Sequence, residues 1–261
     1  MITSTSNSLV KRIRSLRADP RDRRSERMFV LEGVRLVADA LVANADFVAI
    51  VYDPQALRRT AEGSTLLAQL ESHQRGVPAS PQVLDAAADT VSPQGVIAIA
   101  AWPEIEPRTG LRLVLDGVQD PGNVGTLLRS AEAAGVGLVL CSKGCADVFN
   151  PKVVRSAMGA HFALPIRIDL GWNEIATALA NAPAIYAATA NGQVAYYDAD
   201  WHDNAALIVG SEAHGVSADG LTWATHQIAI PMVGRAESLN AGVAGSIILF
   251  EALRQRTRSS R

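Results

Sequence analysis

Three short segments combine glycine with hydroxyl, amide or charged side chains, and each follows an apolar stretch typical of a β-strand. They are 116–129 (DGVQDPGNVGTLLR), 210–215 (GSEAHG) and 230–240 (IPMVGRAESLN). Glycine lets the backbone approach a ligand closely, so exposed N–H and C=O groups in such turns can hydrogen-bond to an adenine edge and a ribose. Because ligands bind at the carboxyl ends of the strands in open α/β sheets, the three turns predict a ligand site.

Several common kinds of site are excluded by the same residues. The sequence has neither the G-x-x-x-x-G-K-[ST] loop nor a G-x-G-x-x-G turn after a strand. It also lacks a G-x-S-x-G elbow, so Ser211 with His214 is only a weak sign of a hydrolase. The five histidines and two cysteines show no zinc spacing, and no metal is expected. Cys141 and Cys145 are interpreted as small buried residues.

Strand and helix patterns alternate along the whole chain, which predicts the α/β class. In the first half, strands are expected at 28–31, 47–51 and 95–101, and helices to about residue 16 and at 34–43, 65–73 and 83–88. In the second half, strands are expected at 111–115, 137–141, 162–168, 184–188, 206–210 and 227–231, and helices at 124–134, 151–158, 172–180 and 239–254. Two prolines and a glycine mark 103–110 as a linker between domains 1–102 and 111–261.

Positive charge is concentrated at the N-terminus. Residues 1–30 hold eight basic and three acidic side chains, a charge of +5, whereas the whole chain carries −2 and the remainder therefore −7. Such a block predicts a docking surface for phosphates, with a solvated helix face as the alternative. The residues assigned to RNA contact here are Lys11, Arg12, Arg14, Arg23 and Arg24. No stretch is long and apolar enough for a membrane span or a secretory signal, so a soluble cytoplasmic protein is expected.

The three turns also carry a family resemblance. In order and spacing, DPGNVGTLLRSA, GSEAHG and IPM…ESLNAGVA resemble the three motifs of the SpoU (TrmH-like) family of RNA 2′-O-ribose methyltransferases. The intervening NPKVVRSAMGAHFALPI is similar too. The segments ITSTSNSLVKRIRSLR, FVLEGVRLVADAL and PQGVIAIA resemble the substrate-binding domain of many members, which is related to the L30e RNA-binding fold. One departure is Ala213-His214, where the family often has glycine followed by a variable residue.

This resemblance implies a SPOUT α/β fold with a C-terminal trefoil knot, preceded by a smaller L30e-like α/β/α domain. It also implies a homodimer with the active site near the subunit interface, and S-adenosyl-L-methionine as the cofactor. The positions assigned to the cofactor are Thr189, Ala190, Asn191, Gly210, Ser211, Glu212, Gly215, Ile230, Met232, Ser238, Leu239 and Asn240.

The catalytic residues implied by the resemblance are Arg129, Asn123, Ser238 and Asn240. Arginine normally stays protonated, so Arg129 is expected to bind the phosphate beside the target ribose and to stabilise the emerging alkoxide. The family proposal that this arginine accepts the proton stays open. Asn123 can instead cap a helix, and Glu212 can either offset the sulfonium charge or sit at a helix start.

The expected activity is 2′-O-ribose methylation of RNA, with 23S rRNA as the substrate. The N-terminal domain favours rRNA, since minimal tRNA-acting relatives often lack it. A tRNA 2′-O-methyltransferase, a non-catalytic RNA-binding protein and a hydrolase using Ser211 and His214 remain alternatives. The intact set Asn123, Arg129, Ser238 and Asn240 argues against a non-catalytic protein.

Overall fold

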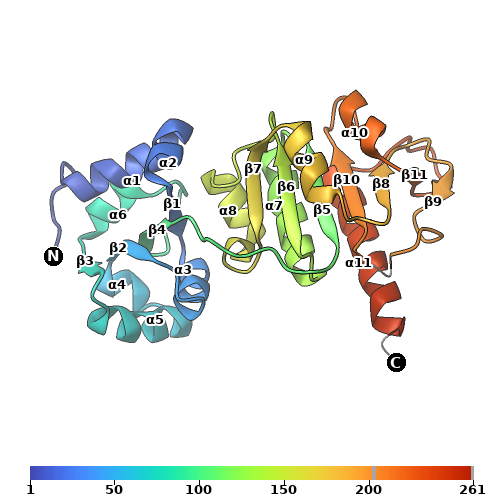
Figure 1. Ribbon diagram of the computed structural model, residues 1–261. Coiled ribbons are helices and arrows are strands. Elements are labelled where there is room, and N and C mark those ends of the chain that lie inside the picture. Colours follow the sequence, from blue (N-terminus) through green and yellow to red (C-terminus); the bar gives the residue numbers. More distant parts are fainter. Residues whose placement is uncertain (202–203, 260–261) are drawn as a thin grey trace. The chain divides into compact units, whose positions relative to one another are not determined.

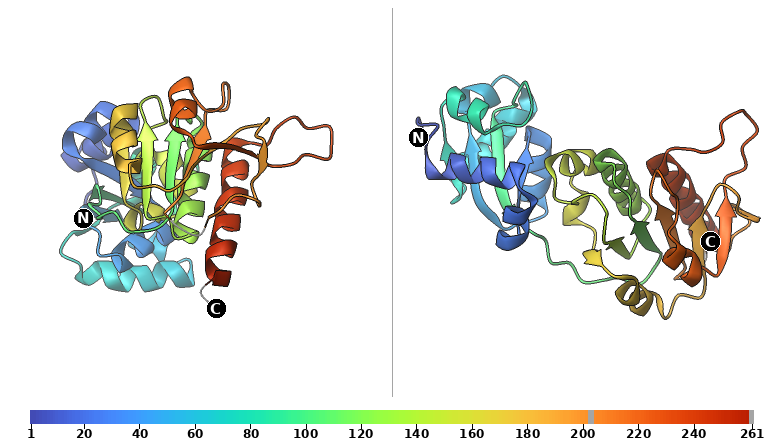
Figure 2. Two further views of the ribbon diagram at one scale, coloured as in Figure 1. Left: turned by 45° about the vertical axis from the view of Figure 1, so that its right-hand side comes forward. Right: turned by 90° about the horizontal axis from the view of Figure 1, so that it is seen from above.

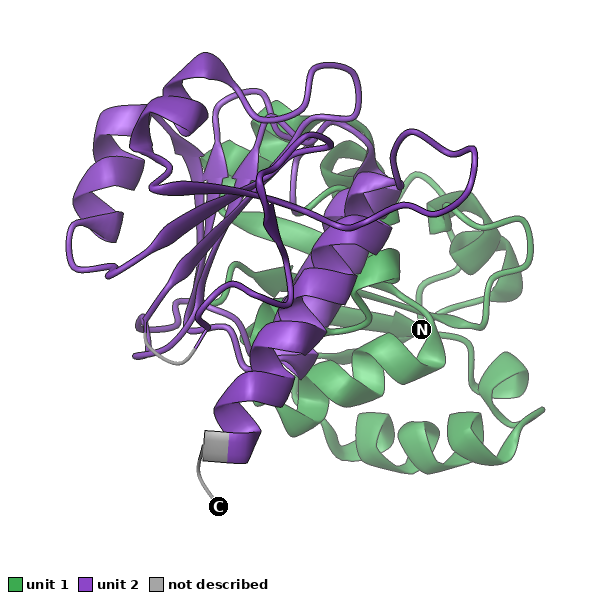
Figure 3. Cartoon of the chain, turned by 90° about the vertical axis from the view of Figure 1, so that its right-hand side faces the viewer, with its two compact units in different colours: residues 1–103, 149–162 green, residues 104–148, 163–261 purple. Residues whose placement is uncertain are grey.

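The computed structural model describes residues 1–201 and 204–259 and divides into two compact units (Figures 1 and 3). Unit 1 comprises Met1–Pro103 and Phe149–Phe162, and unit 2 comprises Glu104–Val148 and Ala163–Arg261. The sequence placed 149–162 within the region 111–261. Its contacts instead group this segment with the N-terminal residues, so the chain enters unit 1 twice.

Unit 1 is built around a four-stranded sheet in the order β1-β4-β2-β3. Strand β4 (Val96–Ala101) pairs antiparallel with β1 (Met28–Glu32) and β2 (Phe47–Tyr52), while β3 (Gly76–Pro78) runs parallel to β2. The helices are α1 (Ser8–Ala18), α2 (Pro20–Glu26), α3 (Val34–Val42), α4 (Pro54–Leu57), α5 (Ala61–Ser72) and α6 (Pro81–Ala87). The sequence prediction missed α2, α4 and β3, which are too short to show a period.

Helix α1 has one buried and one solvent-facing side. Asn7, rather than Ser8, is its N-cap, because the Asn7 side chain accepts from the Leu9 N–H at 2.9 Å. Val10, Ile13 and Leu16 recur every three residues and are fully buried in a core with strand residues. The basic side chains between them therefore fall on other sides of the helix.

Segment 149–162 forms α8 (Pro151–Ala157) and the short 3-10 helix η1 (Ala160–Phe162). Its attachment to unit 1 is aromatic: Phe149 stacks on Trp102 with centroids 4.2 Å apart and also contacts Phe29 at 5.1 Å. Arg155 adds an ion pair with Asp89 at 2.8 Å. Such contacts join residues far apart in sequence, so local periodicity does not predict them.

Unit 2 contains a seven-stranded parallel sheet in the order β7-β6-β5-β10-β8-β11-β9. The strands are β5 (Arg112–Asp116), β6 (Leu138–Ser142), β7 (Ile166–Leu170), β8 (Ile185–Ala188), β9 (Val194–Ala195), β10 (Ala206–Gly210) and β11 (His226–Ala229). All five residues of β10 are buried, as expected for a strand with both faces covered. From β5 the next two strands, β6 and β7, are added toward one edge of the sheet, whereas β8 to β11 lie on the other side of β5. The order therefore changes direction between β5 and β10, and open α/β sheets bind ligands at such a point.

Helices cover both faces of this sheet (Figure 2). They are α7 (Pro121–Ala133), α9 (Trp172–Leu179), α10 (Ala218–Trp223) and α11 (Ala241–Ser259). On one face, Ile175 and Leu179 of α9 join a core with residues of β5, β6, β8 and β10. On the other face α11 packs against α7 so closely that a Cβ on Gly245 would lie 2.3 Å from Leu127 Cδ2.

The α/β prediction for unit 2 is confirmed, with differences at its edges. The strand expected at 162–168 begins only at Ile166, because Phe162 ends η1. Short elements β9 and α10 were not predicted, and α11 begins at Ala241 and continues to Ser259. The trefoil knot stays a prediction from the family resemblance.

The cysteines partly match their interpretation. Cys141 is a buried free thiol on β6, and burial raises its pKa well above the usual value. Cys145 is only half-buried, and its Sγ donates to the Leu115 carbonyl at 3.1 Å. Across 1–201 and 204–259, no helix combines the length and hydropathy needed to cross a membrane.

Candidate functional site

A cleft of about 740 Å³ opens in unit 2 beside the carboxyl ends of β8, β10 and β11 and the start of α11. The residues that line it include all twelve positions that the sequence assigned to a cofactor. These come from four separate segments of the chain. The structure therefore brings the assigned residues together, while their role in binding a cofactor stays a prediction.

The second turn, 210–215, is held closed by its own backbone. Ser211 and Gly215 exchange two N–H···O=C hydrogen bonds of 2.9 Å, and Gly215 has a left-handed φ of 67°. A Cβ on Gly210 would lie 2.1 Å from the Gly215 carbonyl carbon, closer than any real contact. Glycine is thus required at 210, where this turn folds back over the end of β10.

The first turn differs from the sequence interpretation at Asn123. The N-cap of α7 is Asp120, whose Oδ1 accepts from the Asn123 N–H at 2.9 Å, so the prediction that Asn123 caps this helix is wrong. The Asn123 side chain is nearly buried and donates through Nδ2 to Glu212 Oε1 at 2.6 Å. Its amide therefore links the first turn to the second.

Glu212 is the main bridge between those two turns. Besides the Asn123 amide, its carboxylate accepts from the N–H groups of Gln119 at 3.1 Å and Asp120 at 3.3 Å. Partial burial alone would raise the pKa of Glu212, but these hydrogen bonds and one from its own backbone outweigh burial and lower it. The helix-start interpretation is wrong, because 212 lies in a turn and the next helix begins at Ala218.

The third segment joins the same cluster at the start of α11. Asn240 Oδ1 accepts from the Val243 N–H at 3.2 Å, so Asn240 caps this helix as well as lining the cleft. A Cβ added to Gly242 would lie 3.2 Å from Oδ1 of both Asn123 and Asn240. The two asparagines therefore converge on the glycine. Ser238 is exposed and lines the cleft beside them.

Arg129 does not line this cleft. It is exposed on α7 and is not among the described residues that line the cleft. The next residue, Ser130, hydrogen-bonds through its hydroxyl to Ser246 of α11 at 2.7 Å. Arg129 consequently lies on the surface beside the α7–α11 contact.

The chemistry of the cleft suits an amphipathic ligand. Its walls include the apolar side chains of Ile228, Ile230 and Leu239. In the part of the chain that the structure covers, Thr189 Oγ1 is buried at the cleft without a hydrogen-bond partner. Since buried hydroxyls are nearly always bonded, this atom fits a polar group of a bound ligand.

Ser211 and His214 are not arranged as a nucleophile and base. Ser211 Oγ accepts from the backbone N–H of His214 at 3.1 Å, and it lies 3.4 Å from the Gly215 carbonyl oxygen. Both contacts are part of the closed turn. The hydroxyl serves the turn geometry, and the hydrolase interpretation gains no support.

In unit 1, the predicted RNA-contacting residues have different environments. Arg23 is only 2% exposed, and its guanidinium donates to the carbonyls of Leu16 at 2.6 Å and Arg17 at 3.0 Å. Its assignment to RNA is therefore wrong: it binds the C-terminal carbonyls of α1. Arg12 is half-buried and bonded through Nε to Glu26 at 2.8 Å. The exposed residues of the set are Lys11, Arg14 and Arg24.

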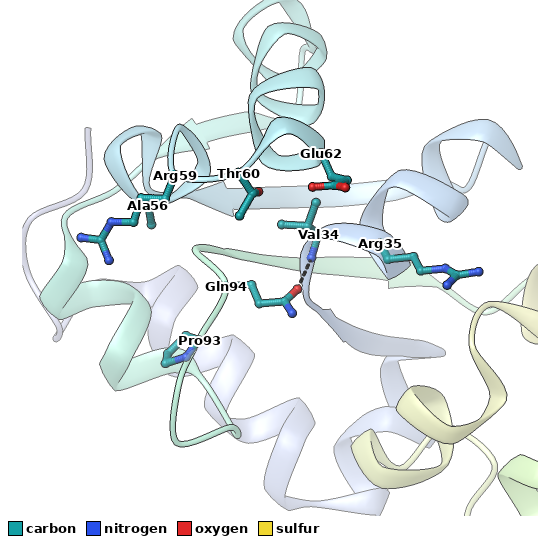
Figure 4. A pocket seen from close by; sticks show the side chains of 8 residues that line it. All are labelled: Val34, Arg35, Ala56, Arg59, Thr60, Glu62, Pro93 and Gln94. Carbon is teal, nitrogen blue, oxygen red and sulfur yellow. Dashed lines mark hydrogen bonds between the residues drawn. The ribbon is translucent and has the colours of Figure 1, made fainter.

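A second pocket of about 390 Å³ lies in unit 1 between α3, the α4–α5 connection and Pro93–Gln94 (Figure 4). Gln94 Oε1 accepts from the Val34 N–H at 2.9 Å and so caps α3, whose N-cap residue is a glycine. Arg35 and Arg59 line this pocket. Sequence reasoning missed both arginines because they lie outside the basic block.

In residues 1–201 and 204–259, no three histidine, cysteine or acidic side chains gather closely enough to hold a metal ion. For an organic cofactor, the chain offers a cleft with apolar walls, turn backbone and a buried hydroxyl.

Comparison with known proteins connects this cleft to a family. The SpoU rRNA Methylase family model matches residues 110–250, and the MRM3-like substrate binding domain model matches residues 7–98. An uncharacterized tRNA/rRNA methyltransferase of Synechocystis sp. is 33% identical, with 99% of this chain and 95% of that protein covered. The 23S rRNA (guanosine(2553)-2′-O)-methyltransferase RlmP of Bacillus subtilis is 32% identical, with 95% of this chain and 97% of that protein covered.

A solved structure supports the same relationship. The SpoU methyltransferase AviRb of Streptomyces viridochromogenes, in complex with the cofactor AdoMet, superposes with a TM-score of 0.84 at 28% identity. The match covers 96% of this chain and 98% of that one. The three glycine-bearing turns, the parallel sheet and the family model over 110–250 agree, and the chain belongs to the SpoU rRNA methylase family.

Proposed function

We propose that this protein transfers a methyl group from S-adenosylmethionine to a ribose 2′-hydroxyl of RNA, with large-subunit rRNA as the substrate. The observation that carries the proposal is the single cleft whose lining includes every position assigned to the cofactor. Family membership and the AdoMet complex of AviRb support the cofactor. The name of RlmP supports a ribose of 23S rRNA as the acceptor.

The cleft residues fit that cofactor by type. Thr189 offers a buried hydroxyl, and the closed turn at 210–215 offers backbone groups beside apolar Ile230 and Leu239. When bound, S-adenosylmethionine supplies a methyl group activated by its positively charged sulfur. The chain's own task is to hold the acceptor oxygen in line with that methyl carbon. Orientation of this kind contributes on the order of 7–11 kcal/mol at best.

The acceptor side is assigned to the asparagine cluster. Asn123 is held by Glu212, so its amide has a fixed direction, while Asn240 and Ser238 lie at the start of α11. Ser238 and Asn240 are assigned to contact the ribose as well as the cofactor. Arg129 binds the phosphate beside the ribose and stabilises the negative charge that develops on the 2′-oxygen, whose proton passes to solvent water.

A homodimer would reconcile Arg129 with the cleft. Val243 and Phe250 of α11 are 47% and 48% exposed, and together with Ile247 they form an i, i+4, i+7 apolar stripe. The segment between β11 and α11 is also exposed and extends outward (Figure 2). A second copy that covers α11 would bury the stripe. In such a dimer, Arg129 of each copy would approach the cleft of the other. Phe250→Glu should then yield monomers by light scattering and lose activity.

Unit 1 is assigned to substrate RNA, through the exposed residues Lys11, Arg14 and Arg24. The match of residues 7–98 to a substrate-binding domain supports this role. Arg12 is assigned a secondary contact with RNA, because its guanidinium already donates to Glu26. The cytoplasm, where rRNA and S-adenosylmethionine are both present, stays the predicted compartment.

The test combines labelled S-adenosylmethionine with total RNA and maps ribose methylation by resistance to alkaline cleavage. Label in rRNA at a 2′-O position is the expected result. Label in tRNA alone would support the tRNA-acting alternative, and RNA binding without label would support a non-catalytic protein.

Arg129→Ala should abolish transfer while calorimetry still detects cofactor binding. Arg167→Ala, which removes an exposed arginine from the edge strand β7, is the control and should transfer normally. Near-normal turnover of the Arg129 variant would refute the role of this residue.

A further inference from the structure

Asp116 is a buried carboxylate that the proposed mechanism does not use. It ends β5, is 5% exposed, and precedes Gly117, whose left-handed φ of 66° begins the first turn. Its Oδ2 accepts from the backbone N–H of Ser217 at 2.7 Å. Its Oδ1 lies 3.4 Å from Ser142 Oγ, which also accepts from the Gly117 N–H at 2.9 Å. Burying a carboxyl group costs free energy unless hydrogen bonds replace the water that it loses.

Ser217 is the residue at which the chain leaves the second turn. The turn closes at Gly215, and two residues later Ser217 caps α10 by accepting from the Gly220 N–H at 3.1 Å. A Cβ on Gly220 would lie 2.9 Å from Asp116 Oδ2, so the first turn of α10 packs directly on the carboxylate. Asp116 therefore fixes the exit of the second turn.

Glu212 makes the opposite connection. It comes from the second turn and accepts from backbone N–H groups of the first, whereas Asp116 comes from the first turn and accepts from the end of the second. Each loop thus supplies a carboxylate to the backbone of the other. These three backbone hydrogen bonds, two to Glu212 and one to Asp116, restrain the two turns more strongly than either carboxylate alone, because a shift of one turn against the other would strain them.

We propose that Asp116 is a positioning residue for cofactor binding, which holds turn 210–215 in the shape that forms the rim of the cleft. The proposal rests on the proposed function of that cleft. Asp116 touches no reacting atom in this account. Asp116 acts by holding Ser217 and, through it, Gly215. Its loss should therefore weaken cofactor binding and leave the rate of methyl transfer unchanged.

Two variants of Ser217 remove or keep the bond without replacing Asp116. Ser217 has φ −65°, the value that proline adopts, so Ser217→Pro keeps this dihedral angle. Its ring carbon takes the place of the N–H hydrogen that bonds Asp116 Oδ2, so the bond is lost and the carboxylate must move away. Ser217→Ala keeps that N–H and loses only the helix cap. We expect the proline variant to bind S-adenosylmethionine at least about tenfold more weakly than the alanine variant, with kcat at saturating cofactor within about threefold.

Variants of Asp116 give the complementary comparison. Asp116→Ala should weaken cofactor binding by a similar factor. Asp116→Asn should restore it, since the amide oxygen can accept from Ser217 and the amide nitrogen can donate to Ser142 Oγ. Asp53→Ala is the control: Asp53 is also 5% exposed and caps α4 in unit 1, so it should lower stability without changing the cofactor Kd.

Calorimetry on residues 1–261 distinguishes a failure of the proposed function from a failure of the proposed role of Asp116. If the native chain does not bind S-adenosylmethionine, the proposed function fails. If it binds, equal affinities of Ser217→Pro and Ser217→Ala overturn the role of Asp116. A kcat loss as large as the affinity loss, or no rescue by asparagine, would also overturn it. Should Asp116→Ala not fold, the Ser217 pair decides.

Discussion

The cofactor residues of unit 2 were predicted from the family resemblance and the basic block of unit 1 from its charge, and the two sets differ in the structure. In the cleft, all twelve assigned residues contribute to one lining. In the basic block, Arg23 is buried, Arg12 bonds Glu26, and the exposed residues are Lys11, Arg14 and Arg24.

The contrast follows from what determines position in each case. Turns that follow parallel strands meet at the carboxyl edge of the sheet, so topology gathers them whatever the flexibility of their side chains. An arginine on a short helix is placed by its own rotatable bonds. Arg23 uses them to reach the carbonyls of Leu16 and Arg17. Spacing therefore predicts the location of a glycine turn better than the direction of a long charged side chain.

Replacing Gly210 with alanine should produce the largest loss of cofactor affinity. Gly210→Ala places a methyl group 2.1 Å from the Gly215 carbonyl carbon, so the turn must open. We expect cofactor affinity to fall by roughly a hundredfold or more, because that displacement removes several contacts at once. Isothermal titration with S-adenosylmethionine measures the change.

Gly234 supplies the matched control for this substitution. It lies in the third segment, and a Cβ there would have no described atom within 4 Å. Gly234→Ala should bind the cofactor normally. If both variants bound alike, the close approach at 210 would have no functional consequence.

The second prediction separates neighbouring arginines of the basic block. Arg23→Ala leaves buried carbonyls of α1 without their donor and should destabilise unit 1 by about 1.5–3 kcal/mol, the usual value for hydrogen bonds to a charged group. Arg24→Ala, at an exposed position, should change stability by less than about 0.5 kcal/mol and instead weaken RNA binding. Urea unfolding and RNA binding curves test both halves. The comparison breaks down if Arg23→Ala is as stable as the native protein.

Much of the fold was predictable because strong periodic signals coincide with its central elements. The strands around the cleft are apolar runs bounded by glycine or polar residues, and β10 was located at its observed bounds. Elements such as α4 and β9 are too short to carry a period. The segment 149–162 was assigned by sequence continuity, yet stacking of Phe149 on Trp102 joins it to unit 1.

The site was predictable as a set of residues but not as a network. Family resemblance named Asn123 and Glu212 separately, and each had a local alternative role at a helix start. The structure instead joins Asn123 Nδ2 to Glu212 Oε1 across 89 positions of the chain. Asp116, which braces the same loops, had no signal of its own. Partners so distant in sequence cannot be identified from spacing alone.

The third prediction concerns the pH dependence of this network. The pKa of Glu212 lies below its usual 4.5 in the folded chain, so its stabilising contribution is complete above about pH 4.5 and is lost as the pH falls through the lower, folded value. Glu212→Gln should lower stability at neutral pH and flatten the loss of stability on acidification. Denaturant titrations at neutral and acidic pH provide the measurement. Glu237→Gln, in the same cleft, is the control, and an identical pH profile for the two variants would contradict the prediction.

The smallest effect is expected at the exposed basic residues of α1. Lys11→Ala and Arg14→Ala should each weaken RNA binding several-fold and reduce the slope of log K against log salt by about 1, since each removes one phosphate contact. Cofactor affinity should not change. Arg58→Ala is the control, because that arginine lies in unit 1 outside the block and pairs with Glu71. If Arg58→Ala lowered the salt slope equally, RNA would be sensing the diffuse charge of unit 1. An unaltered slope in the α1 variants would remove this helix from the RNA-contacting surface and leave the basic block as an ordinary solvated face.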